Sequence, residues 1–269
     1  MEVKKHRRLT LKERVIIQTL LEEKKTKENI ALNLSKSNKV ILLEQRGTGM
    51  SLPTKFDKTS LSIDLALDDI NAILDKLEID KITLLGHSYG SSLALIYASK
   101  FPEKIKSLIL VSTGVFDLDS AFITLCNIKS RLSNQDGKKW ETLYEKTYLK
   151  KITESEKKKL KYLYRLAYFY DKSKIKEYLK RIDRPFNKKT NAILSPDLMN
   201  YNFDFKRELK NVSVSIDIVI GRQDILDFMA YEYKIVKPEI NIHWIDQCGH
   251  FPMFETPKEF YNIINKLLN

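Results

Sequence analysis

Short apolar runs alternate with amphipathic segments along most of the chain. Aliphatic and β-branched residues form such runs at 39–43, 81–86, 105–112, 215–220 and 240–245. Runs of this length and composition are typical of strands that are buried on both faces. We therefore predict that these five segments form strands of one mainly parallel sheet.

Helical periodicity separates these predicted strands. Residues 61–78 place apolar side chains near helical spacing and acidic side chains on the other face. Residues 91–100 are apolar and end before Phe101-Pro102, and residues 257–268 form an amphipathic segment with Pro257 near its start. Strands that alternate with helices predict an α/β fold with helices on both faces of the sheet.

The segment between about 115 and 212 interrupts this alternation. Its pattern predicts helices at about 138–150, 154–170 and 172–182, with few β-branched runs. We expect an inserted helical region between the third and fourth of the predicted strands. An insertion there would lie over the carboxyl ends of the strands, the edge at which open α/β sheets bind ligands.

The first 30 residues allow two interpretations. Residues 14–20 are rich in β-branched side chains and are compatible with a strand, whereas Thr10 and Glu13 form a capping-box pattern that indicates a helix over 11–24. The apolar run at 15–21 is too short for a membrane span and is followed by charged residues rather than a cleavage site. We therefore expect a cytoplasmic protein.

Composition sets further limits on the function. Hydrophobic residues make up 43% of the 269-residue chain, which is enough for a core, and two cysteines exclude a disulfide scaffold. A formal net charge of +12 would suit an anionic partner, but residues 115–195 alone contain 20 basic and 10 acidic side chains. Lys157–Lys159 with nearby tyrosines could bind nucleic acid. A solvated helix face is the simpler interpretation, so we expect neither nucleic acid nor a membrane as a partner.

One motif carries a specific chemistry. Gly86-His87-Ser88-Tyr89-Gly90 follows a predicted buried strand and precedes a predicted helix, which is the context that the Gly-x-Ser-x-Gly nucleophile turn requires. Gly86 and Gly90 are needed because a side chain at either position would crowd the strained turn. We expect Ser88 to be a nucleophile and the backbone N–H of Tyr89 to donate to an oxyanion.

A serine nucleophile needs a histidine base and an acid that orients it. His250 lies in the loop between the fifth predicted strand and the last helix, where the base is expected; His243, within a predicted strand, is the alternative. Asp224 directly follows the fourth predicted strand and is the expected acid, with Asp227 in reserve. This chemistry needs neither a metal nor a cofactor, and we expect none.

Together these motifs resemble the α/β-hydrolase superfamily. Residues 44–51, with the sequence Glu-Gln-Arg-Gly-Thr-Gly-Met-Ser, resemble the Asp-Gln-Arg-Gly-x-Gly-x-Ser signature of proline iminopeptidase-like serine peptidases. The resemblance implies an α/β-hydrolase core at 31–114 and 213–269, and an all-helical cap at 115–212. It also implies that cap acids hold the free amino terminus of a substrate. Acidic residues of the cap include Glu141, Glu145, Glu154, Glu156 and Glu177, and the sequence assigns none of them to this role.

The chain departs from that group at its N-terminus. It lacks the His-Gly-Gly-Pro-Gly-like motif that supplies the group's second oxyanion donor, and only 14 residues precede Val15. We therefore expect a divergent or shortened segment at 1–30, with the group's first strands missing. If residues 14–20 form a strand, they would fill the place of the group's third strand, and Thr19 or Leu20 could supply the missing N–H.

The resemblance implies a serine hydrolase that forms an acyl-enzyme. Its most specific form is an aminopeptidase that releases N-terminal proline, or similar residues, from short peptides. The alternatives are an esterase or amidase that acts on small molecules, and a catalytically impaired binding protein of the same fold. The expected partner is thus a small peptide or ester substrate.

Overall fold

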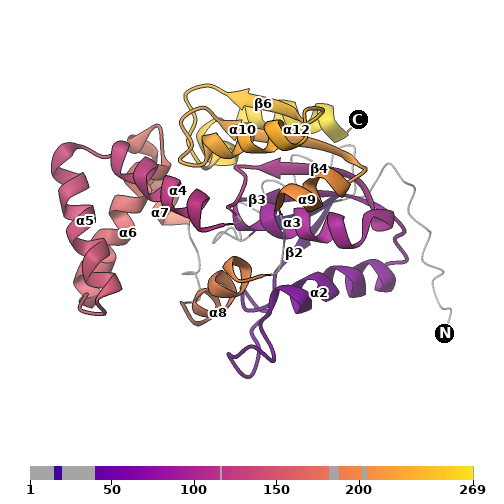
Figure 1. Cartoon of the computed structure of the whole chain (residues 1–269), viewed down its shortest axis with the longest axis horizontal. Helices are drawn as coiled ribbons and strands as arrows, with labels where there is room; N and C mark the ends of the chain where they lie inside the picture. The colour runs from indigo at the N-terminus through magenta and orange to yellow at the C-terminus, as the bar shows by residue number, and fades with distance from the viewer. Residues whose placement is uncertain (1–14, 20–39, 116, 182–187, 202–204, 269) are drawn as a thin grey trace.

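Six parallel strands form the core of the molecule. The structure is a computed structural model that describes residues 15–19, 40–115, 117–181, 188–201 and 205–268. The strands follow the order β2-β1-β3-β4-β5-β6, and all neighbouring pairs are parallel (Figure 1). Their bounds are β1 Val15–Thr19, β2 Val40–Leu43, β3 Ile82–His87, β4 Ile105–Val111, β5 Ser215–Gly221 and β6 Asn241–Ile245. The predicted α/β fold class is confirmed.

The N-terminal strand decides between the two interpretations of the first residues. β1 lies between β2 and β3, where Val15 is in register with both Val40 and Thr83. The prediction of a helix over 11–24 is therefore wrong for residues 15–19, and the possible capping box at Thr10 lies outside the described residues. A strand forms here because the backbone groups on both of its edges find hydrogen-bond partners. An isolated short helix would be only weakly stabilised by helix propensity.

Helices cover both faces of the sheet. α2 (Ile63–Lys76), α3 (Tyr89–Lys100) and α10 (Asp227–Val236) pack on one face, and α12 (Pro257–Leu268) packs on the other. Successive side chains of a strand point to opposite faces, so Leu84 joins the first cluster and Leu85 joins Phe260 and Ile264 of α12 in the second. This explains why β3 is buried along its whole length.

Between β4 and β5, the described residues form six α-helices. They are α4 (Leu118–Ser130), α5 (Asn134–Tyr148), α6 (Glu154–Tyr168), α7 (Ile175–Arg181), α8 (Lys188–Met199) and α9 (Phe205–Asn211), with the 3-10 turn η3 (Lys172–Lys174) before α7. α4 to α7 project beyond one end of the sheet, whereas α9 lies beside α3 (Figure 1). We call α4 to α8 the cap helices; the exact boundaries of a cap at 115–212 stay a prediction.

The predicted cap helices correspond to α5, α6 and the η3–α7 segment, and the sequence did not indicate α4, α8, α9 or α10. α8 contains Pro196 inside the helix, which normally favours a break. α9 is only seven residues long, too short for a periodic pattern to stand out. Along the described residues, no helix combines the length and apolar character needed to cross a bilayer.

The loop after β2 is attached to α2 through an arginine. Arg46 donates from Nε and Nη2 to the two carboxylate oxygens of Asp69, at 2.7 and 2.6 Å, and from Nη1 to the carbonyl of Ser60 at 3.0 Å. A two-bond contact of this kind has a fixed geometry that lysine cannot reproduce. The signature at 44–51 therefore has a structural role in this chain, fixing the loop at the carboxyl end of β2.

We expect Asp69→Asn to lower the free energy of unfolding by about 1–2 kcal/mol, because it removes the charge from a partly buried two-bond contact. Asp75→Asn on the same helix is the matched control. Asp75 pairs with Lys104 in an exposed contact, and its loss should change stability by less than about 0.5 kcal/mol. Urea unfolding of both variants measures the difference, and equal losses would contradict the structural role of Arg46.

Candidate active site

Ser88 occupies a strained turn between β3 and α3. β3 ends at His87 and α3 begins at Tyr89, so Ser88 alone makes the change of direction, with φ 53° and ψ −121°. Positive φ is rare for residues other than glycine. A Cβ on Gly86 would lie 2.2 Å from the carbonyl oxygen of Gly90, so only glycine fits at position 86. The predicted turn has the geometry that raises a serine hydroxyl above the sheet.

His250 meets Ser88 from the other end of the sequence. It lies in the loop between β6 and the short helix α11 (Pro252–Glu255), and its Nε2 is 2.9 Å from Ser88 Oγ. Its Nδ1 is 2.9 and 3.1 Å from the two carboxylate oxygens of Asp224. A carboxylate accepts, so Nδ1 carries the proton and Nε2 is left to accept from the serine hydroxyl.

Asp224 is completely buried just after β5. Burial raises the pKa of its carboxyl group, but the charge and hydrogen bond of His250 and the backbone N–H of Leu226 outweigh burial, so the pKa falls below its ordinary value. Asp224 is therefore ionised at neutral pH and can stabilise a protonated His250. The structure thus brings together the three side chains that the sequence singled out as nucleophile, base and acid.

The backbone of His250 is also held on both sides. His87 Nε2 lies 2.8 Å from the carbonyl oxygen of His250, and because a carbonyl only accepts, the His87 ring is protonated at Nε2. Burial and the neighbouring His250 lower the pKa of His87 to about 3, so this ring is neutral at ordinary pH. On the other side, the N–H of His250 donates to the carbonyl of Tyr168 in the cap at 2.8 Å. No local pattern in the sequence indicates these contacts of His87 and Tyr168.

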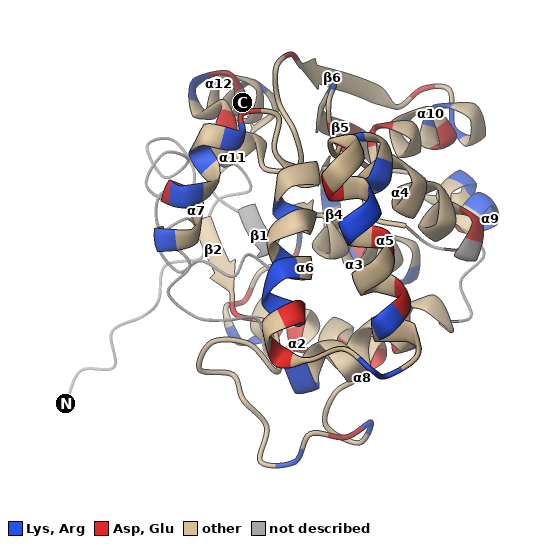
Figure 2. Cartoon of the chain, turned by 90° about the vertical axis from the view of Figure 1, so that its left-hand side faces the viewer, with Lys and Arg blue, Asp and Glu red and all other residues tan. Residues whose placement is uncertain are grey.

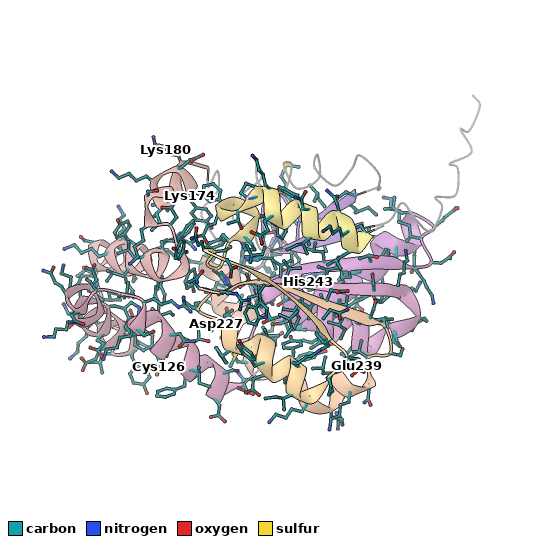
Figure 3. The ribbon with its side chains drawn as sticks, turned by 90° about the horizontal axis from the view of Figure 1, so that it is seen from above. Cys126, Lys174, Lys180, Asp227, Glu239 and His243 are labelled. Carbon is teal, nitrogen blue, oxygen red and sulfur yellow. The ribbon has the colours of Figure 1, made fainter. Side chains whose placement is uncertain are left out.

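The reserve candidates lie elsewhere. His243 is part of β6, where its Nε2 contacts Asp217 of β5 at 2.8 Å (Figure 3). Asp227 begins α10 and pairs with Arg131, the residue after α4, at 3.2 Å. Cys248 is buried, which raises the pKa of its thiol and keeps it protonated, and Cys126 is exposed on α4. The positions of base and acid beside Ser88 are taken by His250 and Asp224, so neither His243 nor Asp227 replaces them.

A cavity of about 600 Å³ opens above Ser88. Its floor comes from the core and includes Ser88 and His250, while its roof comes largely from α6 and α8. α6 contributes Lys161, Tyr164, Arg165 and Tyr168, a spacing that places them on one face of the helix. The volume is in the range of pockets that hold small molecules.

Comparison with known proteins decides the family. The sequence model of the α/β hydrolase fold matches residues 15–257, which is most of the chain. The chain belongs to the α/β-hydrolase family.

Several characterised relatives of this α/β-hydrolase differ in substrate. The proline iminopeptidase of Heyndrickxia coagulans is 25% identical over 254 residues, covering 88% of this chain and 83% of that protein. A 2-hydroxy-6-oxononadienedioate/2-hydroxy-6-oxononatrienedioate hydrolase of Pseudomonas putida is 24% identical, covering 84% and 75%. MenH from S. aureus has the same fold, with a TM-score of 0.68 and 21% identity over 97% of this chain and 94% of that one. The comparisons therefore establish the family, and they do not decide which substrate this chain hydrolyses.

The charges that line the cavity are of one sign. Of the described residues that line it, the formally charged ones are Lys161 and Arg165, and carboxylates are absent from that lining. Arg165 is largely buried, with its guanidinium 5.2 Å from the ring centre of Tyr178 and 5.6 Å from that of Phe251. None of the five cap glutamates considered from the sequence belongs to the described lining.

Two possible oxyanion donors lie at the carboxyl end of the sheet. Tyr89 is the first residue of α3, directly after Ser88. Thr19 ends β1 in register with His87, so the chain leaves β1 beside the serine turn. Leu20 lies outside the described residues. The donor role of each N–H stays a prediction.

We expect Gly86→Ala to destabilise the fold by about 1–3 kcal/mol and to lower activity, because the added Cβ meets backbone that cannot yield easily. Gly137→Ala in α5 is the control. A Cβ there would lie 3.7 Å from its nearest neighbour, so the change should be neutral or stabilise the helix by up to about 1 kcal/mol. Thermal unfolding separates the two, and a stable Gly86→Ala protein would contradict the close approach at the turn.

Proposed function

We propose that this chain is a serine hydrolase that works through an acyl-enzyme. The observation that carries the proposal is the continuous hydrogen-bonded series of Ser88, His250 and Asp224 beneath an accessible cavity. His250 takes the proton of Ser88 as Oγ attacks a carbonyl carbon, and Asp224 stabilises the resulting imidazolium. His250 then gives that proton to the leaving group. Water releases the acyl group by the same steps, with His250 again as base.

The negative oxygen of the tetrahedral intermediate needs backbone donors. We assign the N–H of Tyr89, at the start of α3, as the first donor, because it directly follows the nucleophile and lies at the positive end of the helix dipole. We assign the second donor to the N–H of Thr19 or Leu20; Thr19 ends β1 in register with His87, and Leu20 lies outside the described residues. With both donors in place, the chain does not need the His-Gly-Gly-Pro-Gly-like motif for this purpose.

Two substrate classes follow from different observations. An aminopeptidase for N-terminal proline is supported by the signature at 44–51 and by the similarity to proline iminopeptidases. A small ester or amide is supported by the cavity itself. A free amino terminus is a cation, which the positive charges of Lys161 and Arg165 would repel. We therefore favour a small ester or amide whose acyl group is neutral or anionic.

The basic excess of the chain does not alter this proposal. Lys and Arg are frequent on α6 and α7, with acidic residues among them (Figure 2). Several cations of the cap helices are in exposed ion pairs, such as Lys157 with Glu154, Lys188 with Glu154 and Lys129 with Glu141. We propose that the partner is a small substrate and that neither nucleic acid nor a membrane is bound.

We expect a fluorophosphonate probe to label the wild-type protein at Ser88 and to leave Ser88→Ala unlabelled. Ser130→Ala, which removes an exposed hydroxyl of α4, should be labelled like the wild type. Asp224→Asn should lower kcat by about 10⁴-fold, because the amide favours the wrong histidine tautomer. Mass spectrometry of the labelled peptide locates the probe, and initial rates of ester hydrolysis give kcat. A folded wild-type protein that is not labelled would identify a catalytically impaired binding protein.

We expect 4-nitrophenyl esters of short acids to be hydrolysed with higher kcat/KM than proline or alanine 4-nitroanilides. In the wild type, an ester with a free carboxylate on its acyl chain should have a higher kcat/KM than the neutral ester. Arg165→Gln should abolish this difference in kcat/KM, because the attraction to the guanidinium is removed. Initial rates with each substrate provide the comparison. Preference for the proline anilide would instead support the aminopeptidase.

A further inference from the structure

A buried carboxylate lies beside the active site without belonging to the Ser88–His250–Asp224 series. Glu255 ends α11 and is 3% exposed. Its Oε1 accepts the backbone N–H of Gly249 at 2.9 Å, and its Oε2 accepts the N–H groups of Tyr170 and Asp171 at 2.9 and 3.2 Å. Each oxygen therefore serves a different segment of the chain.

The two segments are the histidine loop and the cap. Gly249 immediately precedes His250, whereas Tyr170 and Asp171 lie two and three residues after the end of α6. The segments touch backbone to backbone, since the His250 N–H donates to the carbonyl of Tyr168 and a Cβ on Gly249 would lie 2.2 Å from that oxygen. Glu255 thus occupies the junction between the catalytic loop and the roof of the cavity.

Burying the carboxylate of Glu255 costs hydration free energy, which its hydrogen bonds must offset. Burial raises the pKa of Glu255 to about 7, and the surrounding backbone N–H groups act in the opposite direction. A buried carboxylate is tolerated only when such donors compensate the lost hydration. On the solvent side, Lys174 of η3 donates to the backbone carbonyl of Glu255 at 2.6 Å, which adds a further link between α11 and the cap (Figure 3).

We propose that Glu255 is a positioning residue for His250, which it fixes by joining the histidine loop to the cap segment Tyr168–Asp171. The inference rests on the proposed serine hydrolase. It makes the cap part of the support of the catalytic base as well as the roof of the cavity. Tyr168 connects the two roles, because it lines the cavity and its carbonyl holds the His250 N–H.

The main test is Glu255→Gln, which keeps the size of the side chain but turns one acceptor into a donor that faces an N–H. We expect kcat to fall between about 10-fold and 100-fold, because a displacement of about 1 Å at a catalytic group can cost about 100-fold. KM should change less than kcat, since Glu255 itself does not line the cavity. Glu259→Gln is the matched control, because Glu259 is exposed on α12 and its loss should leave kcat unchanged.

A second measurement does not depend on turnover. The proton on His250 Nδ1, hydrogen-bonded to Asp224, should give a low-field NMR signal that is absent from His250→Ala. We expect this signal to weaken or shift in Glu255→Gln and to stay unchanged in Glu259→Gln. Hydrogen exchange at 168–171 and 248–250 should be faster in Glu255→Gln alone.

A pair of cap variants covers the case in which Glu255→Gln does not fold. Asp171→Pro removes the backbone N–H that donates to Glu255. Asp171→Ala keeps this N–H and is the matched control, because both variants lose the Asp171 carboxylate. The φ of Asp171 is −86°, close to the value that proline imposes. We expect kcat to be lower in Asp171→Pro than in Asp171→Ala.

The outcomes separate this inference from the proposed function. If fluorophosphonate does not label the wild type, the proposed serine hydrolase function is wrong. The NMR signal and the exchange rates still decide whether Glu255 positions His250. A folded Glu255→Gln protein with wild-type kcat, an unchanged low-field signal and unchanged exchange would overturn the positioning role.

Discussion

Hydrogen bonds with four residues hold His250 in place, and these residues belong to three parts of the molecule: the serine turn, the end of β5 and the cap. Its ring contacts Ser88 at the turn after β3 and Asp224 after β5. Its backbone accepts from His87 and donates to Tyr168 in the cap. A histidine can act as a base only when its tautomer and its distance to the nucleophile are both fixed. Sheet, serine turn and cap must therefore all be folded before the base is in position.

The parallel sheet makes this arrangement possible. Ser88, Asp224 and the His250 loop all follow the carboxyl ends of strands, and parallel strands bring those ends to one edge. β1 lies between β2 and β3, so β3, the strand before the serine turn, is paired on both sides. The strain stored at Ser88 is tolerable because the surrounding strand and helix are buried and rigid.

The cap helices form the roof of the cavity above this framework. α6 presents one polar and aromatic face to the cavity, and its C-terminal end contacts the histidine loop directly. The same helix therefore lines the cavity and contacts the backbone of His250, the proposed base. This arrangement is consistent with a family whose members share a core and differ in substrate, since the helices above the core can change while the sheet edge is kept.

The sequence by itself determined the features that depend on near neighbours. The strand, the turn and the helix around Ser88 lie within one short segment, so the need for glycine at 86 is visible in the residues themselves. The order of Ser88, Asp224 and His250, each after an apolar run, was also sufficient to select them. Tertiary structure alone decided the features that depend on distant partners. Residues 15–19 have the composition of a strand and the flanking pattern of a helix, and only the space between β2 and β3 decided the outcome. The contacts of His87 with His250 and of Glu255 with Tyr170 join residues that are far apart in the chain, and no local pattern encodes them.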